Sequence, residues 1–158
     1  MSLFKKSLPL FLIPFFLCGC GQKDFGPKHS HYALGISVRA PEEWQRNRLS
    51  PAEALSSMAL KDGKGGMIIV TLNVENNFAR QMEISSKLNY PVVEKGFLLF
   101  SKYKTKWLRS TEGRMSYLTY VVKASEGQIF TITCVAPSIN FVFYRPKFDL
   151  LAKSFRAF

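Results

Sequence analysis

The sequence has few of the residues from which metal sites and many catalytic centres are built. Its 158 residues include only two histidines, His29 and His31, and three cysteines. A His-x-His pair binds a metal weakly, and no third ligand accompanies this one. We therefore predict no metal site and no cofactor, and we interpret both histidines as part of a tether or a strand edge.

Acidic residues are also sparse, and they form no catalytic pattern. There are 11 Asp and Glu. Glu42 and Glu43 are adjacent and point apart if the backbone is extended, and the other glutamates considered are scattered: Glu75, Glu83, Glu94 and Glu112. A nucleophile with its base, or a pair of carboxylates, is not recognisable. We predict that the protein is not an enzyme. A hydrolase whose carboxylates meet only in the folded chain is the distant alternative.

The N-terminal apolar run, Leu8 to Cys18, is too short to cross a bilayer. A membrane-spanning helix needs about 20 apolar residues, and Pro9 and Pro14 interrupt this run. Lys5 and Lys6 precede it and small residues follow it, an arrangement typical of a signal peptide.

Leu17-Cys18-Gly19-Cys20 resembles a bacterial lipobox, in which the last cysteine receives the lipid. This resemblance predicts removal of residues 1–19 and membrane anchoring through acylated Cys20, because two or more acyl chains hold a protein stably. A secretory signal that is cleaved without lipidation remains the alternative. Gly21 is not the Asp that retains enterobacterial lipoproteins at the inner membrane, so we expect a lipoprotein on the periplasmic face of the outer membrane.

Processing would leave a single free cysteine. Cys18 leaves with the signal peptide and Cys20 becomes a thioether, so Cys134 has no partner for an internal disulfide. Cys134 alternates with Phe130 and Ile132 on the apolar face of a predicted strand. We interpret it as a small buried hydrophobic residue and not as a reactive thiol.

The mature chain is strongly basic. Lys and Arg total 22 against 11 Asp and Glu, and loss of Lys5 and Lys6 leaves a net charge of +9. Such a surface suits anionic lipid, glycan or nucleic acid. Outside the cytoplasm nucleic acid is the least expected of these, so we predict a membrane and an envelope protein as partners, and no nucleic acid.

Most of the remaining chain shows the two-residue periodicity of strands. After a polar tether over 20–30, alternation of Tyr32, Leu34, Ile36 and Val38 predicts a strand, and Ser50 to Glu53 has the spacing of a capping box around one helical turn. Further strands are predicted from alternation and composition; they lie over 55–60, 68–74, 97–109, 114–123 and 128–136.

Two segments have helical periodicity. One begins at Asn76 or Asn77 and runs to about Asn89, with an apolar face predicted inward that consists of Phe78, Met82 and Leu88. The other is an apolar stripe that packs on the sheet, made of Phe141, Tyr144, Phe148, Leu151 and Phe155. We expect its regular part to begin at Pro146, because proline suits the first position of a helix.

One basic constellation has two interpretations. Lys102, Lys104 and Lys106 share one face of a predicted strand, with Tyr103 and Trp107 on the other. Arg109 and Arg114 extend the positive charge. The segment is either an edge strand that lysines protect from pairing with other chains, or a surface for anionic headgroups, glycan or an acidic protein.

Three short motifs resemble those of PsbP/DcrB-like (Mog/PsbP-type) domains. They are Ile36-Ser-Val-Arg-Ala-Pro41-Glu-Glu-Trp44, the strand Met67 to Val74, and Tyr144-Arg-Pro-Lys-Phe148 followed by Ser154-Phe155-Arg156. The resemblance implies an α+β fold over 31–158, an antiparallel sheet flanked by helices in an α/β/α sandwich. Members tend to be non-catalytic proteins that bind or assemble protein complexes, and bacterial ones are often envelope lipoproteins. The clusters of the metal-associated photosynthetic members are not matched here.

These observations together favour a non-enzymatic, lipid-anchored envelope protein that binds or scaffolds another envelope component. The alternative is a binder of anionic lipid or glycan through Lys102, Lys104 and Lys106.

Overall fold

The computed structural model describes residues 25–89, 91–99 and 101–158. The predicted signal peptide, Cys20 and the first part of the predicted tether lie outside these residues. The strands are β1 Lys28–His31, β2 Ile36–Arg39, β3 Gln45–Arg46, β4 Ser57–Lys61, β5 Met67–Leu72, β6 Val92–Phe97, β7 Lys104–Glu112, β8 Met115–Ser125, β9 Gln128–Pro137 and β10 Arg156–Ala157. The α-helices are α1 Pro51–Ala54, α2 Phe78–Leu88 and α3 Phe141–Ser154, and short 3₁₀ helices cover Tyr32–Leu34 and Ser138–Asn140.

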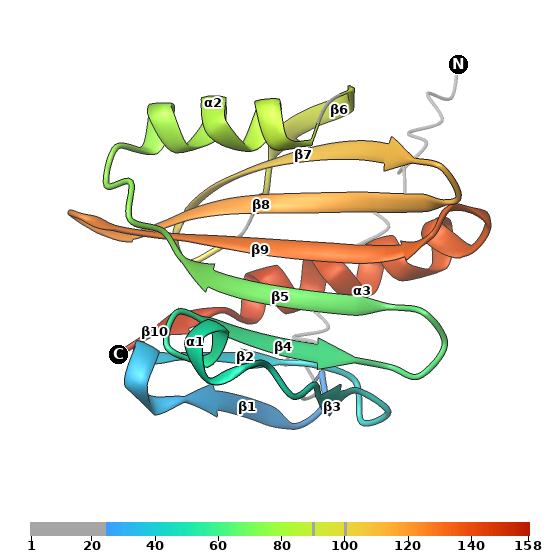
Figure 1. Ribbon diagram of the computed structural model, residues 1–158, viewed down its shortest axis with the longest axis horizontal. Coiled ribbons are helices and arrows are strands. Elements are labelled where there is room, and N and C mark those ends of the chain that lie inside the picture. The colour runs from blue at the N-terminus through green and yellow to red at the C-terminus, as the bar shows by residue number, and fades with distance from the viewer. Residues whose placement is uncertain (1–24, 90, 100) are drawn as a thin grey trace, which may run out of the picture.

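The strands form two antiparallel sheets (Figure 1). The large sheet has seven strands in the order β3-β4-β5-β9-β8-β7-β6, and the small one has the order β1-β2-β10. The long neighbours β7, β8 and β9 are joined by tight turns at the positions expected from Gly113 and Gly127, both of which have positive φ. The predicted dense β region is therefore the centre of the large sheet.

The two longer helices cover opposite faces of the large sheet. Neighbouring residues of a strand point to opposite faces. On β8 the Thr119 hydroxyl donates to Asn89 at the end of α2, whereas the hydroxyl of the next residue, Tyr120, donates to Asp149 of α3. The predicted antiparallel sheet with helices on both sides is confirmed.

The main core lies between the large sheet and α3. The predicted stripe is buried along α3, with Phe148 and Leu151 fully inaccessible to solvent. Trp44, from the predicted Pro-x-x-Trp motif, meets Phe148 edge to face at 6.2 Å between ring centroids. The aromatic spacing of this segment therefore reflects packing on the sheet.

The start of α3 differs from the prediction. The helix begins at Phe141 and continues through Pro146. Proline lacks the N–H that would bond to the carbonyl of Val142. Val142 lies on the exposed side of the helix, where water can reach this part of the backbone. The missing bond is thus tolerated inside the helix.

The strand predicted through Tyr32 and Val38 is interrupted. His31 accepts a hydrogen bond from the Leu34 amide at its Nδ1, and Gly35 has φ +61°, so the chain turns at Tyr32–Leu34 and returns as β2. The preceding strand β1 begins at Lys28, within the segment predicted as tether. A local cap and one glycine therefore make a hairpin where alternation indicated a single strand.

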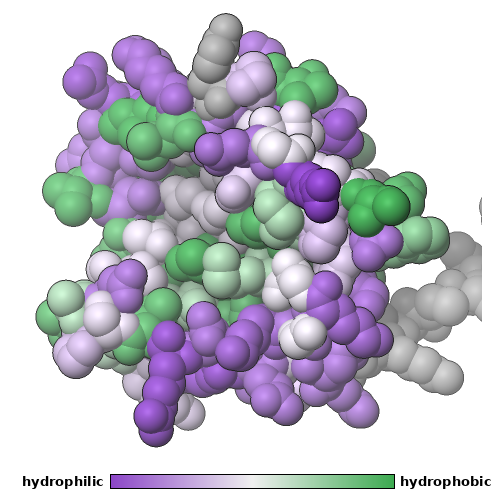
Figure 2. Space-filling view, turned by 45° about the vertical axis from the view of Figure 1, so that its right-hand side comes forward, coloured by the Kyte–Doolittle hydropathy of each residue, from purple (hydrophilic) through white to green (hydrophobic). Residues whose placement is uncertain are grey.

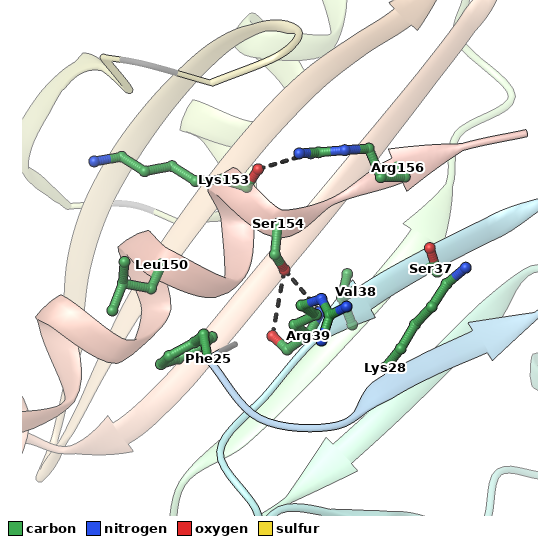
Figure 3. Close-up of a pocket in the computed structure, with 9 residues that line it drawn as sticks. All are labelled: Phe25, Lys28, Ser37, Val38, Arg39, Leu150, Lys153, Ser154 and Arg156. Atoms are coloured by element: carbon green, nitrogen blue, oxygen red, sulfur yellow. Dashed lines mark hydrogen bonds between the residues drawn. The ribbon is translucent and has the colours of Figure 1, made fainter. Parts of the chain in front are cut away.

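The hairpin β1–β2 is fastened to the end of α3 (Figure 3). The Arg39 amide donates to Ser154 Oγ at 2.7 Å, and Ser154 Oγ lies 2.6 Å from the Leu151 carbonyl to which it donates. The last residues of the chain then join β2 as β10. The strands nearest the two ends of the described chain, β1 and β10, thus lie on either side of β2.

The apolar face predicted for α2 is confirmed only in part. Phe78 and Met82 are half-buried, whereas Leu88 is 79% exposed and the fully buried residues are the polar Gln81 and Ser85. The sheet beneath presents Thr119, whose hydroxyl donates to Asn89 at the end of α2. The prediction that Leu88 faces inward is thus wrong. The predicted cap is confirmed at Asn77, whose Oδ1 accepts from the Ala79 and Arg80 amides.

The predicted strand over 97–109 is two strands. β6 ends at Phe97 and β7 begins at Lys104, and the Leu98 amide donates to the Thr105 carbonyl to close the turn between them. Neither glycine nor proline marks this turn in the sequence. β6 was consequently not predicted.

Figure 2 turns the end of the molecule where α3 begins toward the viewer. Hydrophobic groups lie there between hydrophilic ones.

None of the helices in the described part of the chain is long and apolar enough to span a membrane.

Candidate functional site

Two of the three lysines of the predicted basic surface lie on the face of the sheet that α2 covers. Lys104 and Lys106 both approach the ring of Phe78 in α2, at 5.2 and 5.9 Å from its centroid. Lys102 precedes β7 and lies over Tyr103. The opposite orientation of Tyr103 and Trp107 is confirmed, because Tyr103 packs on Phe155 and Trp107 on Arg145.

The edge-strand interpretation of these lysines is wrong for most of β7. This strand pairs with β8 along its whole length and with β6 from Lys106 onward, so β6 is the edge of the sheet. Lys104 alone of the lysines in the strand extends past the end of β6. The lysines therefore do not serve mainly to block a free edge.

The structure separates the two arginines from these lysines. Arg109 points to the α3 side of the sheet, with its guanidinium 5.4 Å from the centroid of Phe141. Arg114 is exposed in the turn between β7 and β8. The five predicted residues thus do not form one continuous surface.

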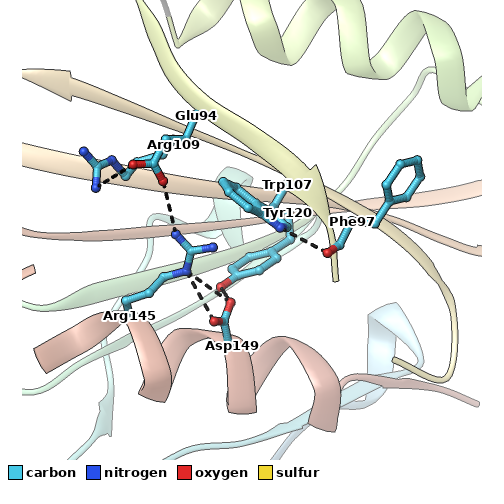
Figure 4. A network of polar contacts seen from close by, with 7 residues as sticks. All are labelled: Glu94, Phe97, Trp107, Arg109, Tyr120, Arg145 and Asp149. Carbon is cyan, nitrogen blue, oxygen red and sulfur yellow. Dashed lines mark hydrogen bonds and ion pairs between the residues drawn. The ribbon is translucent and has the colours of Figure 1, made fainter. Parts of the chain in front are cut away.

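A polar network on the α3 side joins the edge strand β6 to α3 (Figure 4). Arg145 lies between two carboxylates, with Nε 3.3 Å from Asp149 and Nη1 3.9 Å from Glu94. Arg109 contacts the same Glu94 at 3.5 Å. The two acidic side chains thus face the arginine between them and not each other.

Tyr120 anchors the inner end of this network. Its hydroxyl donates to Asp149 at 2.6 Å. Burial is the main cause that raises the pKa of Tyr120 far above its ordinary value. The phenol therefore stays protonated and acts as a fixed donor.

The indole ring of Trp107 lies between Arg145 and β6. The Arg145 guanidinium stacks 4.2 Å from its ring centroid, and its indole N–H donates to the Phe97 carbonyl at 3.2 Å. On the neighbouring strand the ring covers Gly96, where an added Cβ would lie 2.9 Å from Trp107. Glycine at this position is what lets the indole lie flat against β6.

A pocket of about 410 Å³ opens beside the network, between the start of α3 and strands β7 and β8. Arg109, Arg145, Ser116 and Ser138 supply its polar groups, and the two serine hydroxyls are 3.0 Å apart. Arg109 Nε is buried and has no hydrogen-bond partner among the described residues. The described lining of this pocket is thus basic and contains no acidic residue.

Apolar side chains rim this pocket on the solvent side. Ile139, Val142 and Phe143 are 86%, 69% and 72% exposed. Their spacing of three and four residues places them on one side of the helical start, and Val142 also lines the pocket. We call these three residues and the pocket the α3 entry site.

Sequence reasoning missed most of this site. Only Arg109 was among the predicted residues. Arg145 and Asp149 have the i, i+4 spacing of a helical ion pair, a signal that the sequence does contain. The partnership of Arg145 with Glu94, 51 positions earlier, is not local and follows only from the fold.

The other predicted groups contribute no reactive site to the described chain. Cys134 is fully buried, and burial raises the pKa of its thiol well above the ordinary value, so the prediction of a buried hydrophobic residue is confirmed. Within 25–89, 91–99 and 101–158, no three His, Cys, Asp or Glu side chains group closely enough to hold a metal ion. Cys20 lies outside these residues.

Comparison with known proteins identifies the fold. No protein-family model matches the chain, and no curated protein matches its sequence. The cyanobacterial PsbP protein CyanoP of Synechocystis sp. PCC 6803 has a similar structure, with a TM-score of 0.60 and 14% identity over 92% of this chain and 99% of that one. The chain spans 49% of a second similar structure, from Bacteroides thetaiotaomicron VPI-5482, with a TM-score of 0.60 and 10% identity.

Two further similar structures come from different settings. One is LpqN of Mycobacterium tuberculosis, described as involved in cell envelope biogenesis, with a TM-score of 0.53 and 11% identity over 84% of this chain and 85% of that one. The other is the Ran-binding protein Mog1p of Saccharomyces cerevisiae, with a TM-score of 0.53 and 9% identity over 83% and 94%. The fold is therefore PsbP/Mog1-like, as the sequence motifs implied.

Proposed function

We propose that this protein is a non-enzymatic envelope lipoprotein, anchored through acylated Cys20, whose domain binds another envelope protein at the α3 entry site. The observation that carries the proposal is the exposed apolar side formed by Ile139, Val142 and Phe143 next to a pocket with two arginines. Apolar side chains that are exposed together next to a pocket are typical of protein-binding surfaces. The partner that fits is a protein segment with apolar residues beside a carboxylate.

The network beside the site supports binding rather than catalysis. Asp149 and Glu94, the carboxylates that converge there, are both held by arginines, and Asp149 also accepts from Tyr120. A general base needs a carboxylate that can reach the proton of a substrate. Here the carboxylates serve to position Arg145 on Trp107.

The similar structures are consistent with this proposal. Mog1p is described as binding Ran, and LpqN as acting in cell envelope biogenesis. A binding role in the envelope extends these descriptions to the present chain. The anchor itself rests on the lipobox resemblance at Leu17 to Cys20.

The anchor is tested by the intact mass of the mature protein. We expect the wild type to begin at Cys20 and to carry acyl chains, and Cys20→Ala to lack them and to leave the membrane fraction. An unmodified mature wild-type chain in the same preparation would contradict the anchor.

The binding surface is tested by in-cell crosslinking. A photo-crosslinking residue placed at position 143 is compared with one at position 55, because Leu55 is also 77% exposed but lies away from the α3 entry site. We expect one envelope protein to crosslink from 143 and not from 55, and the product to persist at high salt as apolar interfaces do. The same set of products from both positions would contradict a specific surface.

A second candidate function is binding of anionic lipid or glycan through Lys102, Lys104 and Lys106. The observation that favours it is that Lys102 and Lys104 are exposed at one end of β7. If this second function is correct, changing all three lysines to Gln abolishes binding to anionic vesicles.

A further inference from the structure

A second pocket lies between α2 and the strands β6 and β7 at the edge of the large sheet (Figure 1). Its volume is about 410 Å³, within the range of pockets that take small molecules. Met82 and Glu83 line it from α2, and Lys95, Phe97 and Lys106 line it from the strands. It shares none of its described lining residues with the α3 entry site. We call this pocket the α2 cleft.

The α2 cleft has apolar surface from both the helix and the sheet. Met82 is half-buried, and Phe97 is 63% exposed. Methionine is flexible and adapts to apolar groups of different shapes, and covering an exposed phenylalanine ring with another apolar group is favourable. These walls therefore suit a hydrocarbon chain.

Two lysines place ammonium groups at the same cleft. Lys95 on β6 is paired with Leu108, two residues from Lys106 on β7, so the two lysines lie on one face of the sheet as diagonal neighbours. Diagonal positions on neighbouring strands are about 7–8 Å apart. Two lysine side chains at this spacing are long enough to meet at one anion.

No acidic side chain of the described chain pairs with either ammonium group. The Lys106 ammonium lies 5.1 Å from the ring centroid of Phe97 and 5.9 Å from that of Phe78, and these aromatic faces hold it beside the cleft. Among the described residues, the ammonium groups of Lys95 and Lys106 make no ion pair and no hydrogen bond. Glu83 is paired with Lys87 at 2.7 Å. The N–H donors of both lysines are thus available to a bound anion.

This lining favours an acyl chain over a peptide segment. A peptide carries a backbone N–H at nearly every residue, and each one that becomes buried needs an acceptor. The lysines of the cleft supply donors, and the carboxylate of Glu83 is already held by Lys87. A hydrocarbon chain has no polar group to satisfy, and a terminal carboxylate accepts from both lysines.

We propose that the α2 cleft binds a fatty acid in its carboxylate form, with the carboxylate on Lys95 and Lys106 and the chain against Met82 and Phe97. The proposal depends neither on the acyl anchor nor on the α3 entry site. It is also distinct from binding of a membrane surface, because it places one molecule in one pocket.

The test is photo-crosslinking of the full-length protein with a fatty acid that carries a diazirine on its chain, supplied in phosphatidylcholine vesicles. Peptide mass spectrometry identifies the labelled positions, and we expect labels at Met82 and Phe97. The methyl ester of the same fatty acid keeps the chain and removes the charge, so it should label these positions at least about tenfold less. Equal labelling by the ester would overturn the proposal, because the lysines would then not recognise the carboxylate.

Two pairs of lysine substitutions separate the cleft from general attraction to positive charge. Lys95→Gln with Lys106→Gln should lower labelling by the fatty acid about tenfold or more. Lys102→Gln with Lys104→Gln removes the same charge from the same region but outside the lining of the cleft, and should retain the labelling. Equal loss in both pairs would overturn the proposal. Unchanged melting temperatures show that the variants are folded.

Two further outcomes concern other occupants. Excess acetate, which has no chain, should leave the labelling unchanged, and its loss in acetate would favour a small anion over a fatty acid. A photo-crosslinking residue at position 97 is placed in the full-length protein in cells, and we expect it to yield acyl-chain adducts. A single envelope protein crosslinked from position 97 instead would overturn the proposal in favour of a protein partner.

Discussion

Asp62 holds the turn between β4 and β5 against the core. Its Oδ1 accepts from the amides of Lys64 and Gly66 at 2.8 and 2.9 Å, and its Oδ2 accepts from the Tyr144 hydroxyl at 2.5 Å. Gly66 lies directly under Tyr144 and Trp44. A hairpin loop that the sequence marks only by Gly and Asp is thus a packing element of the α3 side.

Gly66→Ala should destabilise the protein by steric overlap. An added Cβ would lie 2.5 Å from Tyr144 Cε1 and 2.9 Å from Trp44 Cη2. Overpacking of this kind costs about 1–3 kcal/mol, and we expect that loss in the free energy of unfolding, measured by urea denaturation. Lys64→Ala, at an exposed position of the same loop, is the control and should change this free energy by no more than about 0.5 kcal/mol. An equally small loss for Gly66→Ala would contradict the steric argument.

The stability of the protein should depend on the charge of Asp62 at acid pH. Burial raises the pKa of Asp62, but hydrogen bonds from Tyr144 and from the amides of Lys64 and Gly66 outweigh this and leave the pKa below its usual value of 3.8. The ionised carboxylate therefore stabilises the fold at higher pH, and this contribution is lost as the pH falls below about 4 toward the lowered pKa.

The corresponding measurement compares melting temperatures of the wild type and Asp62→Asn across the acid range. We expect Asp62→Asn to be less stable by about 1–2 kcal/mol at neutral pH and the difference to shrink below about pH 4. Glu112→Gln, at an exposed position at the end of β7, serves as the control for removal of one acidic group. A constant difference at all pH values would show that the Asp62 charge is not involved.

At the scale of elements, α2 and α3 differ in how they are held. α3 buries Phe148 and Leu151, whereas α2 buries only Gln81 and Ser85. Buried apolar area provides most of the stabilisation of a packed helix. α2 should consequently open more readily than α3, with faster amide hydrogen exchange.

Two leucine substitutions measure this difference. Leu151→Ala removes a fully buried side chain and should lower the free energy of unfolding by about 2–5 kcal/mol. Leu88→Ala removes an exposed side chain at the end of α2 and should change it by no more than about 0.5 kcal/mol. Denaturation curves of both variants give the comparison. A large loss for Leu88→Ala would mean that this residue is covered by a partner or a second copy.

At the scale of the whole molecule, the positive charge is divided among separate places. Lys104 and Lys106 lie beside α2, Arg109 lies in the α3 entry site, and Lys28 and Arg156 lie near the chain entry. Composition alone gives the total charge and not this distribution. The total charge therefore does not identify one anion-binding surface.

Binding to anionic vesicles should therefore depend on location and not on the number of charges. If the second candidate function holds, changing Lys102, Lys104 and Lys106 to Gln should weaken vesicle sedimentation more than changing Lys28, Arg114 and Arg156 to Gln, which removes the same number of charges. The binding of all variants should fall at about 0.5 M salt, where screening is strong. Equal weakening by the two triple changes would contradict the second candidate function.

The elements that could be predicted from the sequence are those whose signals lie within a few neighbouring residues. The capping box at Ser50, the cap at Asn77, the glycine turns and the aromatic stripe of α3 depend on neighbours within a few positions, and all appear in the structure. The motifs around Trp44 and Phe148 also indicated the correct fold. The burial of Cys134 was predicted from the two-residue periodicity of its strand.

Which residues share a site depends on contacts between distant segments. The turn between β6 and β7 has no glycine or proline, and the burial of Gln81 and Ser85 in α2 has no local signal in the sequence. Arg145 meets Glu94, and Lys28 meets Arg39 and Arg156, through strand pairings and helix packing between distant segments. Such contacts depend on sheet order and on which side of a strand each residue faces, and neither is specified by the sequence around a single residue.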